Sequence, residues 1–219
     1  MALNTILDFL QELKENNNRE WFAENKNRFI EEKQKFEFFI EILIREIAKF
    51  DENIGALQAK DCIFRIYRDV RFSKDKSPYK TNFGAFMVPG GKKSGHAGYY
   101  IHVDPDESFL AGGVHLPPPD ILKKIRLSIF DHTDEFKGIL EDPKFIKNYG
   151  EINADKLKTA PKGFPKEFPD IDLLKFKSFT VVDSVSKSEL IKEDFLIKAA
   201  KIFKVLYPYN QFLNHAIND

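Results

Sequence analysis

The chain has 219 residues, a length that suits one large domain or two small ones. Its 42% hydrophobic and 31% charged residues are typical of a folded globular protein and exclude a disordered one. The 34 Lys and Arg residues balance the 34 Asp and Glu residues, so no net charge attracts the whole protein to nucleic acid or to an anionic membrane. Any such binding requires a local patch of charge.

The N-terminal sequence predicts two helices. Apolar residues recur at helical spacing from Leu3 to Leu13, and the polar turn "NNN" follows, where Asn18 is expected to cap the next helix. The second helix is predicted from about Asn18 to Phe50, because hydrophobic residues recur in it every seven positions: Phe22, Phe29, Phe36, Leu43 and Phe50. A coiled-coil seam is an alternative, but phenylalanine at these positions favours packing within the domain.

No basic leader precedes the first helix and no run of about 18 apolar residues exists, so we expect no signal peptide and no membrane partner, and a cytoplasmic location. The single cysteine, Cys62, excludes an intrachain disulfide and a zinc site built mainly from cysteines. We expect it to be a small buried hydrophobic residue, with a reactive thiol as the alternative.

From residue 62 the hydrophobic period changes from helical spacing to two. This alternation predicts short strands at 62–68, 83–88, 97–103, 108–114 and, later, within 175–185. The turn "DPDE" at 104–107 predicts an antiparallel hairpin in which His102 faces Phe109. His96, Tyr100, His102 and His115 are then expected on one face of the sheet, and Gly98 and Gly113 on that face leave room for a ligand or a closely packed helix.

The C-terminal half predicts helices around a late strand. Pro119 is placed to begin a helix, and residues 188–206 form an amphipathic pattern after which Pro208 is expected to start a last helical piece. Residues 158–170 hold three prolines and are expected to be irregular, anchored by Phe164 and Phe168, rather than a linker between domains. We therefore predict a single α+β domain over residues 1–219, with an antiparallel or mixed sheet of about five strands, helices packed on it, and long N-terminal and C-terminal helices.

The segment "RIYRDVRFSKDKSPYKTN" at 65–82 is the main candidate for function. Seven cations and three anions lie between Lys60 and Lys80, a local surplus of four positive charges. Arginine binds phosphate and carboxylate in two-point geometry, and lysine adds point charge. The candidate ligand-binding residues are Arg65, Arg68, Arg71, Lys76, Tyr79 and Lys80, and Asp69 is expected to orient one guanidinium group.

A structural interpretation of the same segment stands beside the functional one. Asp69 would bridge Arg68 and Arg71, Asp75 would pair with a lysine, and the network would tie a loop to the sheet.

The pattern Arg65-x-x-Arg68-Asp69-x-Arg71-Phe72-x-x-Asp75-Lys76-x-x-Tyr79 resembles the signature of a widespread bacterial family, the domain of unknown function 2461. The length and the sequence "NNNREWF" near the start fit the same family, so the resemblance covers nearly the whole chain. It implies one family-wide domain and a shared purpose for the motif, and it carries over no catalytic role.

The remaining motifs are weaker. His96 and His115 would supply only two metal ligands, so no metal site is expected. Trp21 beside Arg19 suits stacking on a base, but a tryptophan at a helix start is more often a core anchor. The loop "GGKKSGH" lacks the ending of a phosphate-binding P-loop and the helix that would follow it.

The expected function is binding of a phosphorylated or carboxylated small molecule through the motif. If the protein is an enzyme, Asp69, Asp75 and His102 are the candidates for acid–base catalysis. The alternatives are an interaction module for nucleic-acid backbone or an acidic protein, and a purely structural ion-pair motif. Balanced net charge disfavours nucleic acid without excluding it, and the sequence selects no cofactor, reaction or oligomeric state.

Overall fold

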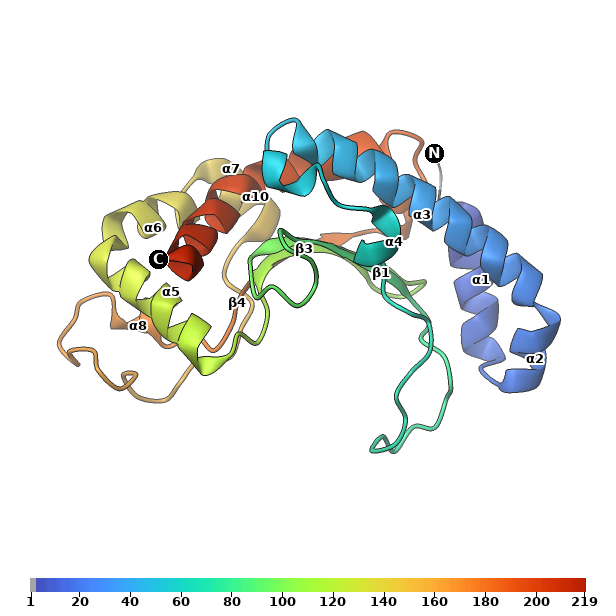
Figure 1. Ribbon diagram of the computed structural model, residues 1–219, viewed down its shortest axis with the longest axis horizontal. Coiled ribbons are helices and arrows are strands. Elements are labelled where there is room, and N and C mark those ends of the chain that lie inside the picture. The colour runs from blue at the N-terminus through green and yellow to red at the C-terminus, as the bar shows by residue number, and fades with distance from the viewer. Residues whose placement is uncertain (1–2) are drawn as a thin grey trace. The chain divides into compact units, whose positions relative to one another are not determined.

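The computed structural model describes residues 3–219 and has the predicted α+β class (Figure 1). Its four strands form one antiparallel sheet in the order β1-β2-β3-β4. The strands are β1 (Phe83–Met87), β2 (Gly98–Val103), β3 (Ser108–Val114) and β4 (Phe179–Val185).

Ten α-helices and one 3-10 helix, η1, lie within the same residues 3–219. They are α1 (Asn4–Glu15), α2 (Arg19–Glu24), α3 (Lys26–Ala48), η1 (Glu52–Ile54), α4 (Ala59–Cys62), α5 (Pro119–Asp131), α6 (Thr133–Leu140), α7 (Pro143–Tyr149), α8 (Ile171–Leu174), α9 (Lys187–Leu190) and α10 (Phe195–Asn218). The chain divides into two compact units: the first is Met1–Met87, Tyr100–Leu110 and Ser184–Lys201, and the second is Val88–Tyr99, Ala111–Asp183 and Ile202–Asp219.

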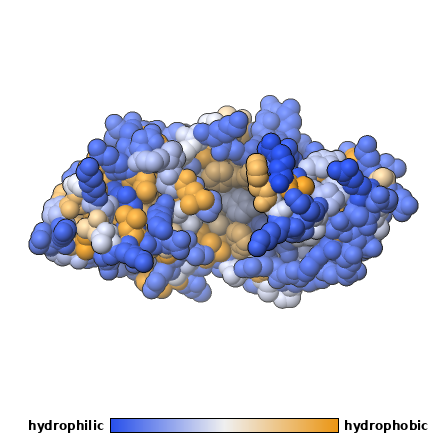
Figure 2. Space-filling model, turned by 90° about the horizontal axis from the view of Figure 1, so that it is seen from below, coloured by the Kyte–Doolittle hydropathy of each residue, from blue (hydrophilic) through white to orange (hydrophobic). Residues whose placement is uncertain are grey.

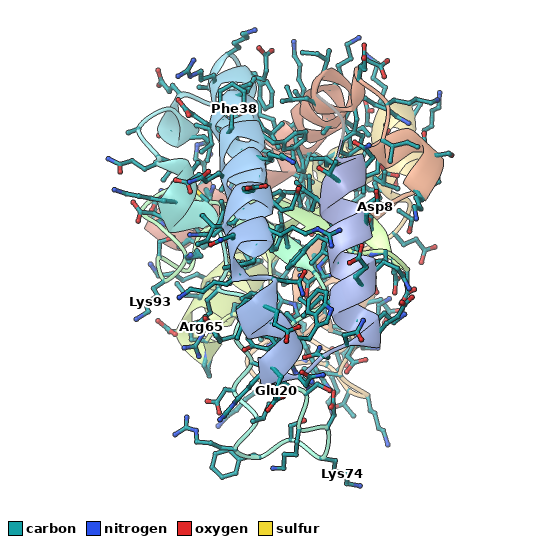
Figure 3. All side chains as sticks on the ribbon, turned by 90° about the vertical axis from the view of Figure 1, so that its right-hand side faces the viewer. Asp8, Glu20, Phe38, Arg65, Lys74 and Lys93 are labelled. Atoms are coloured by element: carbon teal, nitrogen blue, oxygen red, sulfur yellow. The ribbon has the colours of Figure 1, made fainter. Side chains whose placement is uncertain are left out.

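In the first unit, α1 and α3 lie side by side and enclose an aromatic core (Figure 3). The predicted stripe does pack within the chain, since Phe36 and Leu43 are fully buried and the ring of Phe36 lies 5.4 Å from that of Phe83 in β1. Cys62 is buried, as expected.

The second helix is shorter than predicted. Asn18 caps it as expected, because its side chain accepts a hydrogen bond from the backbone N–H of Trp21. However, α2 ends at Glu24 and α3 begins at Lys26. At the break, the side-chain amide of Asn25 donates to the Trp21 carbonyl. Asparagine is a poor residue inside helices because its side chain competes in this way for backbone hydrogen-bonding groups.

The β2–β3 hairpin has the predicted register. The rings of His102 and Phe109 stack at 4.6 Å, and the hydroxyl of Tyr100 lies 2.9 Å from Nδ1 of His102, so all three share one sheet face. His96 and His115 lie just outside the strands, and the period of the strands therefore does not assign them to this face.

The expected strand at 62–68 is wrong, which leaves four strands rather than about five. Cys62 ends α4, and the following residues make only isolated bridges, Ile63 with Ala85 and Tyr67 with Tyr79. Ile63 and Tyr67 are four positions apart, whereas their partners Ala85 and Tyr79 are six positions apart. The two bridges therefore belong to different registers, and no continuous ladder forms. We call residues 64–82 the arm; it extends as a long loop before β1 (teal in Figure 1).

In the second unit, α10 packs against residues of β2 and β3. The rings of Tyr99 and Phe203 lie 5.3 Å apart, and Gly112 permits the approach, because a Cβ there would stand 2.1 Å from Leu206. Gly113, at φ +93°, passes so close to β4 that a Cβ would lie 1.9 Å from the carbonyl oxygen of Phe179. Neighbouring backbone, rather than a ligand, thus takes up the space beside Gly113.

In the C-terminal half, Pro119 begins α5 as predicted, but two other predictions need correction. The helix expected at 188–206 is divided into α9 and α10, and Pro208 lies inside α10 instead of starting a new piece. Pro208 has no N–H to donate to the carbonyl of Lys204, and both residues are exposed, so we expect water to bond that carbonyl instead. The segment 158–170 is irregular as predicted, and both Phe164 and Phe168 pack against the ring of Phe130.

The surface seen in Figure 2 is largely hydrophilic, with hydrophobic residues gathered in patches. Among residues 3–219, no helix combines the length and the apolar character needed to cross a bilayer.

Candidate functional site

The arm holds the sequence motif in two antiparallel segments joined by a turn-rich tip. Two backbone hydrogen bonds join its sides, from Arg68 N–H to Pro78 (3.0 Å) and from Lys80 N–H to Ile66 (2.7 Å), and a third ties it to β1, from Phe64 N–H to Gly84 (2.9 Å). Lys74 lies farther out on the arm than Arg65 (Figure 3). The base of the arm is thereby fixed to β1, while the tip extends from it.

Arg68 and Asp75 form the ion pair nearest the base of the arm. Arg68 also donates to the carbonyl of Ser77 at 3.2 Å, and its side chain is only 26% exposed. Asp75 accepts hydrogen bonds from the Ser77 hydroxyl (2.6 Å) and amide (2.9 Å). These two bonds and Arg68 lower the pKa of Asp75 to about 2. The structure thus pairs Asp75 with an arginine, not with a lysine as the structural interpretation supposed.

A second pair lies at the exposed tip. Arg71 contacts Asp69 through two guanidinium nitrogens, at 3.0 and 2.7 Å, and this contact lowers the pKa of the Asp69 carboxyl. Lys76 donates to the carbonyl of Val70 at 3.0 Å. Asp69 and Asp75 are therefore both ionised near neutral pH, which suits hydrogen-bond acceptors better than proton donors.

A shallow pocket of about 410 Å³ lies at the base of the arm, entirely within the first unit. Its lining residues are Lys14, Asn17, Arg68, Asp75, Ser77, Tyr79, Lys80, Thr81 and Asn82. Three cations thus meet one carboxylate, with hydroxyl and amide groups around them. Lys14 comes from α1 and is ion-paired with Asp106 in the β2–β3 turn.

Asn17 and Tyr79 fasten the arm beside this pocket. Asn17 accepts from the backbone N–H of Tyr79 at 3.1 Å and donates to its carbonyl at 3.0 Å. The Tyr79 ring stacks on Phe22 at 3.9 Å, and burial raises the pKa of the Tyr79 hydroxyl.

His102 lies next to the pocket through Asn82. Two groups approach the same ring nitrogen, Nδ1: the Tyr100 hydroxyl at 2.9 Å and the Asn82 side-chain amide at 3.4 Å. Burial lowers the pKa of His102 below its usual value of 6.5, so the ring is neutral at pH 7.

The structure brings together only some of the predicted ligand-binding residues. Arg68, Tyr79 and Lys80 line the pocket, whereas Arg65, Arg71 and Lys76 do not. Lys14 and Asn17 were missed, because nothing in the local pattern of either residue indicates that it meets a segment more than 50 positions away. Within residues 3–219, no group of three or more His, Cys, Asp or Glu side chains is arranged to hold a metal ion.

The model of a family described as conserved hypothetical protein (DUF2461) matches residues 5–212, nearly the whole chain. No curated protein and no solved structure matches.

Proposed function

The chain belongs to the DUF2461 family, and on that basis we propose that its motif serves to bind a phosphorylated or carboxylated small molecule in the pocket at the base of the arm. The observation that carries the proposal is the convergence of Lys14, Arg68 and Lys80 on one pocket from separate parts of the chain. Charge-assisted hydrogen bonds from such groups are the strongest contacts that proteins offer to oxyanions.

Neutral donors complete the site. The side chains of Asn17, Ser77, Thr81 and Asn82 line the same pocket and carry amide or hydroxyl groups that suit the remaining oxygens of an anion. Asp75 lowers the local positive charge, but it also fixes the orientation of Arg68. A guanidinium has five N–H donors in a planar fork, enough to serve a carboxylate and a ligand together.

The motif then divides into two parts. Arg68 and Lys80 serve the ligand, while Asp69, Arg71 and Lys76 fold the tip through contacts within the arm.

One observation favours a second function, binding of single-stranded nucleic acid. Phe72 at the tip is 95% exposed beside Arg71, and Tyr67 is 51% exposed on the same arm. Exposed aromatic rings among cations are the usual platform for unpaired bases. Binding of this kind weakens steeply with salt, and oligonucleotide titrations at two salt concentrations separate it from binding of a small anion.

Thermal unfolding in phosphate tests the main proposal. At constant ionic strength, phosphate at 100 times its Kd should stabilise the protein by roughly 2.7 kcal/mol relative to chloride. Lys80→Gln should remove most of this response. Lys74→Gln is the matched control, because it removes the same charge from the same arm at a residue outside the pocket. A parent protein that responds equally to phosphate and chloride would exclude the proposal.

A further inference from the structure

An aromatic surface adjoins the proposed anion pocket. It consists of Phe64 on the arm, Tyr100 and His102 on β2, and Phe109 on β3, and we call these four residues the aromatic floor. The ring centroids lie 6.1 Å apart for Phe64 and Tyr100, 5.8 Å for Tyr100 and Phe109, and 4.6 Å for His102 and Phe109. Phe64 is 39% exposed and the other three are half-buried, so solvent reaches this face of the sheet.

Two residues join the floor to the pocket. Lys80 lines the pocket, and its ammonium group lies 5.5 Å from the centre of the Phe64 ring. Asn82 lines it as well, and its amide nitrogen is 3.4 Å from Nδ1 of His102. A ligand held by the pocket cations therefore has aromatic rings within reach of its uncharged part.

Gly84 lets the floor take this form. A Cβ at this position would lie 2.6 Å from the Tyr100 hydroxyl, so the absence of a side chain leaves the space in which the tyrosine ring lies. In that position Tyr100 reaches Nδ1 of His102.

One neutral tautomer of His102 satisfies both contacts at Nδ1. The Asn82 amide nitrogen donates only and the Tyr100 hydroxyl is able to donate, so in that tautomer Nδ1 accepts and Nε2 carries the proton. The floor thus combines faces for stacking with an N–H donor.

We propose that the ligand is a planar aromatic molecule bearing a phosphate or carboxylate, with its anionic group in the pocket and its ring on the aromatic floor. The inference rests on the proposed function and adds the chemical class of the ligand. Cations alone would accept any small anion. The adjoining aromatic surface is what favours a planar ring, since aromatic pairs gain stability beyond the area that they bury.

Calorimetric titration of the full chain with three probes tests the inference. The probes are phenyl phosphate, cyclohexyl phosphate, which has a ring of similar size that is not planar, and inorganic phosphate. We expect phenyl phosphate to bind about tenfold more tightly than cyclohexyl phosphate. Phe64→Leu should abolish this preference, with the affinity of the same variant for inorganic phosphate as its reference. Phe72→Leu, which changes an exposed ring outside the floor, should retain the preference.

The outcomes separate the two claims. If inorganic phosphate binds but phenyl phosphate has no advantage, or if Phe64→Leu retains the advantage, the aromatic class is wrong and the anion site stands. If none of the three probes binds, the anion site is wrong and the inference falls with it. Phe109→Leu provides the same comparison should Phe64→Leu fail to fold.

Discussion

Asn17 and Tyr79, 62 positions apart, hold each other through two reciprocal hydrogen bonds between the side chain of the first and the backbone of the second. This contact fixes the base of the arm to the turn between α1 and α2. Charged residues of the arm and Lys14 of α1 line the pocket beside this junction.

Asn17→Ala should therefore loosen the arm. Losing two hydrogen bonds, each with a net contribution of about 0.5–1.5 kcal/mol, should lower the free energy of unfolding by about 1–3 kcal/mol. Hydrogen exchange at the Tyr79 amide should also accelerate. Asn16→Ala is the control, since the side-chain amide of Asn16 donates to the Glu12 carbonyl in α1 and not to the arm. Unchanged exchange at Tyr79 would mean that the stacking of Tyr79 on Phe22 suffices to hold the arm.

Arg68→Gln should separate the ligand-binding and structural roles of the motif. The Arg68–Asp75 pair is partly exposed, and pairs of this kind contribute little net stability, so Tm should stay within about 3 °C of the parent value. Phosphate-dependent stabilisation should fall strongly. A large drop in Tm, with the response to phosphate intact, would identify Arg68 as a structural tie.

Phe36→Ala should destabilise the monomer by about 3–5 kcal/mol, because it empties a fully buried aromatic site. Phe38→Ala, on the same helix at a side chain that is 51% exposed, should have little effect. Denaturant unfolding measures the free energy of unfolding, and sedimentation measures the state of association. A Phe36 variant that unfolds normally but changes its state of association would show that the stripe is an interface.

The His102 ring should titrate below its usual pKa of 6.5, because burial disfavours its charged form. As pH falls through 6.5, His102 is protonated in the unfolded chain before it is protonated in the folded chain. His102 therefore lowers the free energy of unfolding at acidic pH. Tyr100→Phe removes a donor that stabilises the neutral ring and should raise the pKa. Tyr67→Phe, on the exposed arm, should not. NMR titration of the imidazole signals measures the shift, and a midpoint of 6.5 or higher in the parent would contradict this account.

The sequence alone predicted those elements whose structure depends on residues adjacent in the chain. Strand β3 has its predicted bounds, 108–114, because the alternation of its residues and the preceding turn act locally, and Asn18 caps α2 for the same reason. The strand expected at 62–68 does not form, although the alternation of its side chains suits pairing. The segment that faces it has two more residues between the two bridges, so the strands cannot stay in register. That mismatch depends on a second segment and is not visible in the first.

The candidate site shows the same limit. The motif drew attention to Arg68 and Lys80, whose chemistry is evident from the sequence, but not to their surroundings. Lys14 and Asn17 reach the pocket because helix packing brings the end of α1 and the turn that follows it to the arm. Conversely, Arg71 and Lys76 share the charge of the motif and yet make their contacts within the tip.

A crystal structure of the protein grown with tungstate, a heavy analogue of phosphate, would test the central claim most directly. We predict a peak of anomalous scattering in the pocket at the base of the arm, within hydrogen-bonding distance of Arg68 and Lys80. Peaks confined to Arg71 and Lys76 at the tip, or an empty pocket in crystals that bind tungstate elsewhere, would contradict the assignment of this pocket as the anion site.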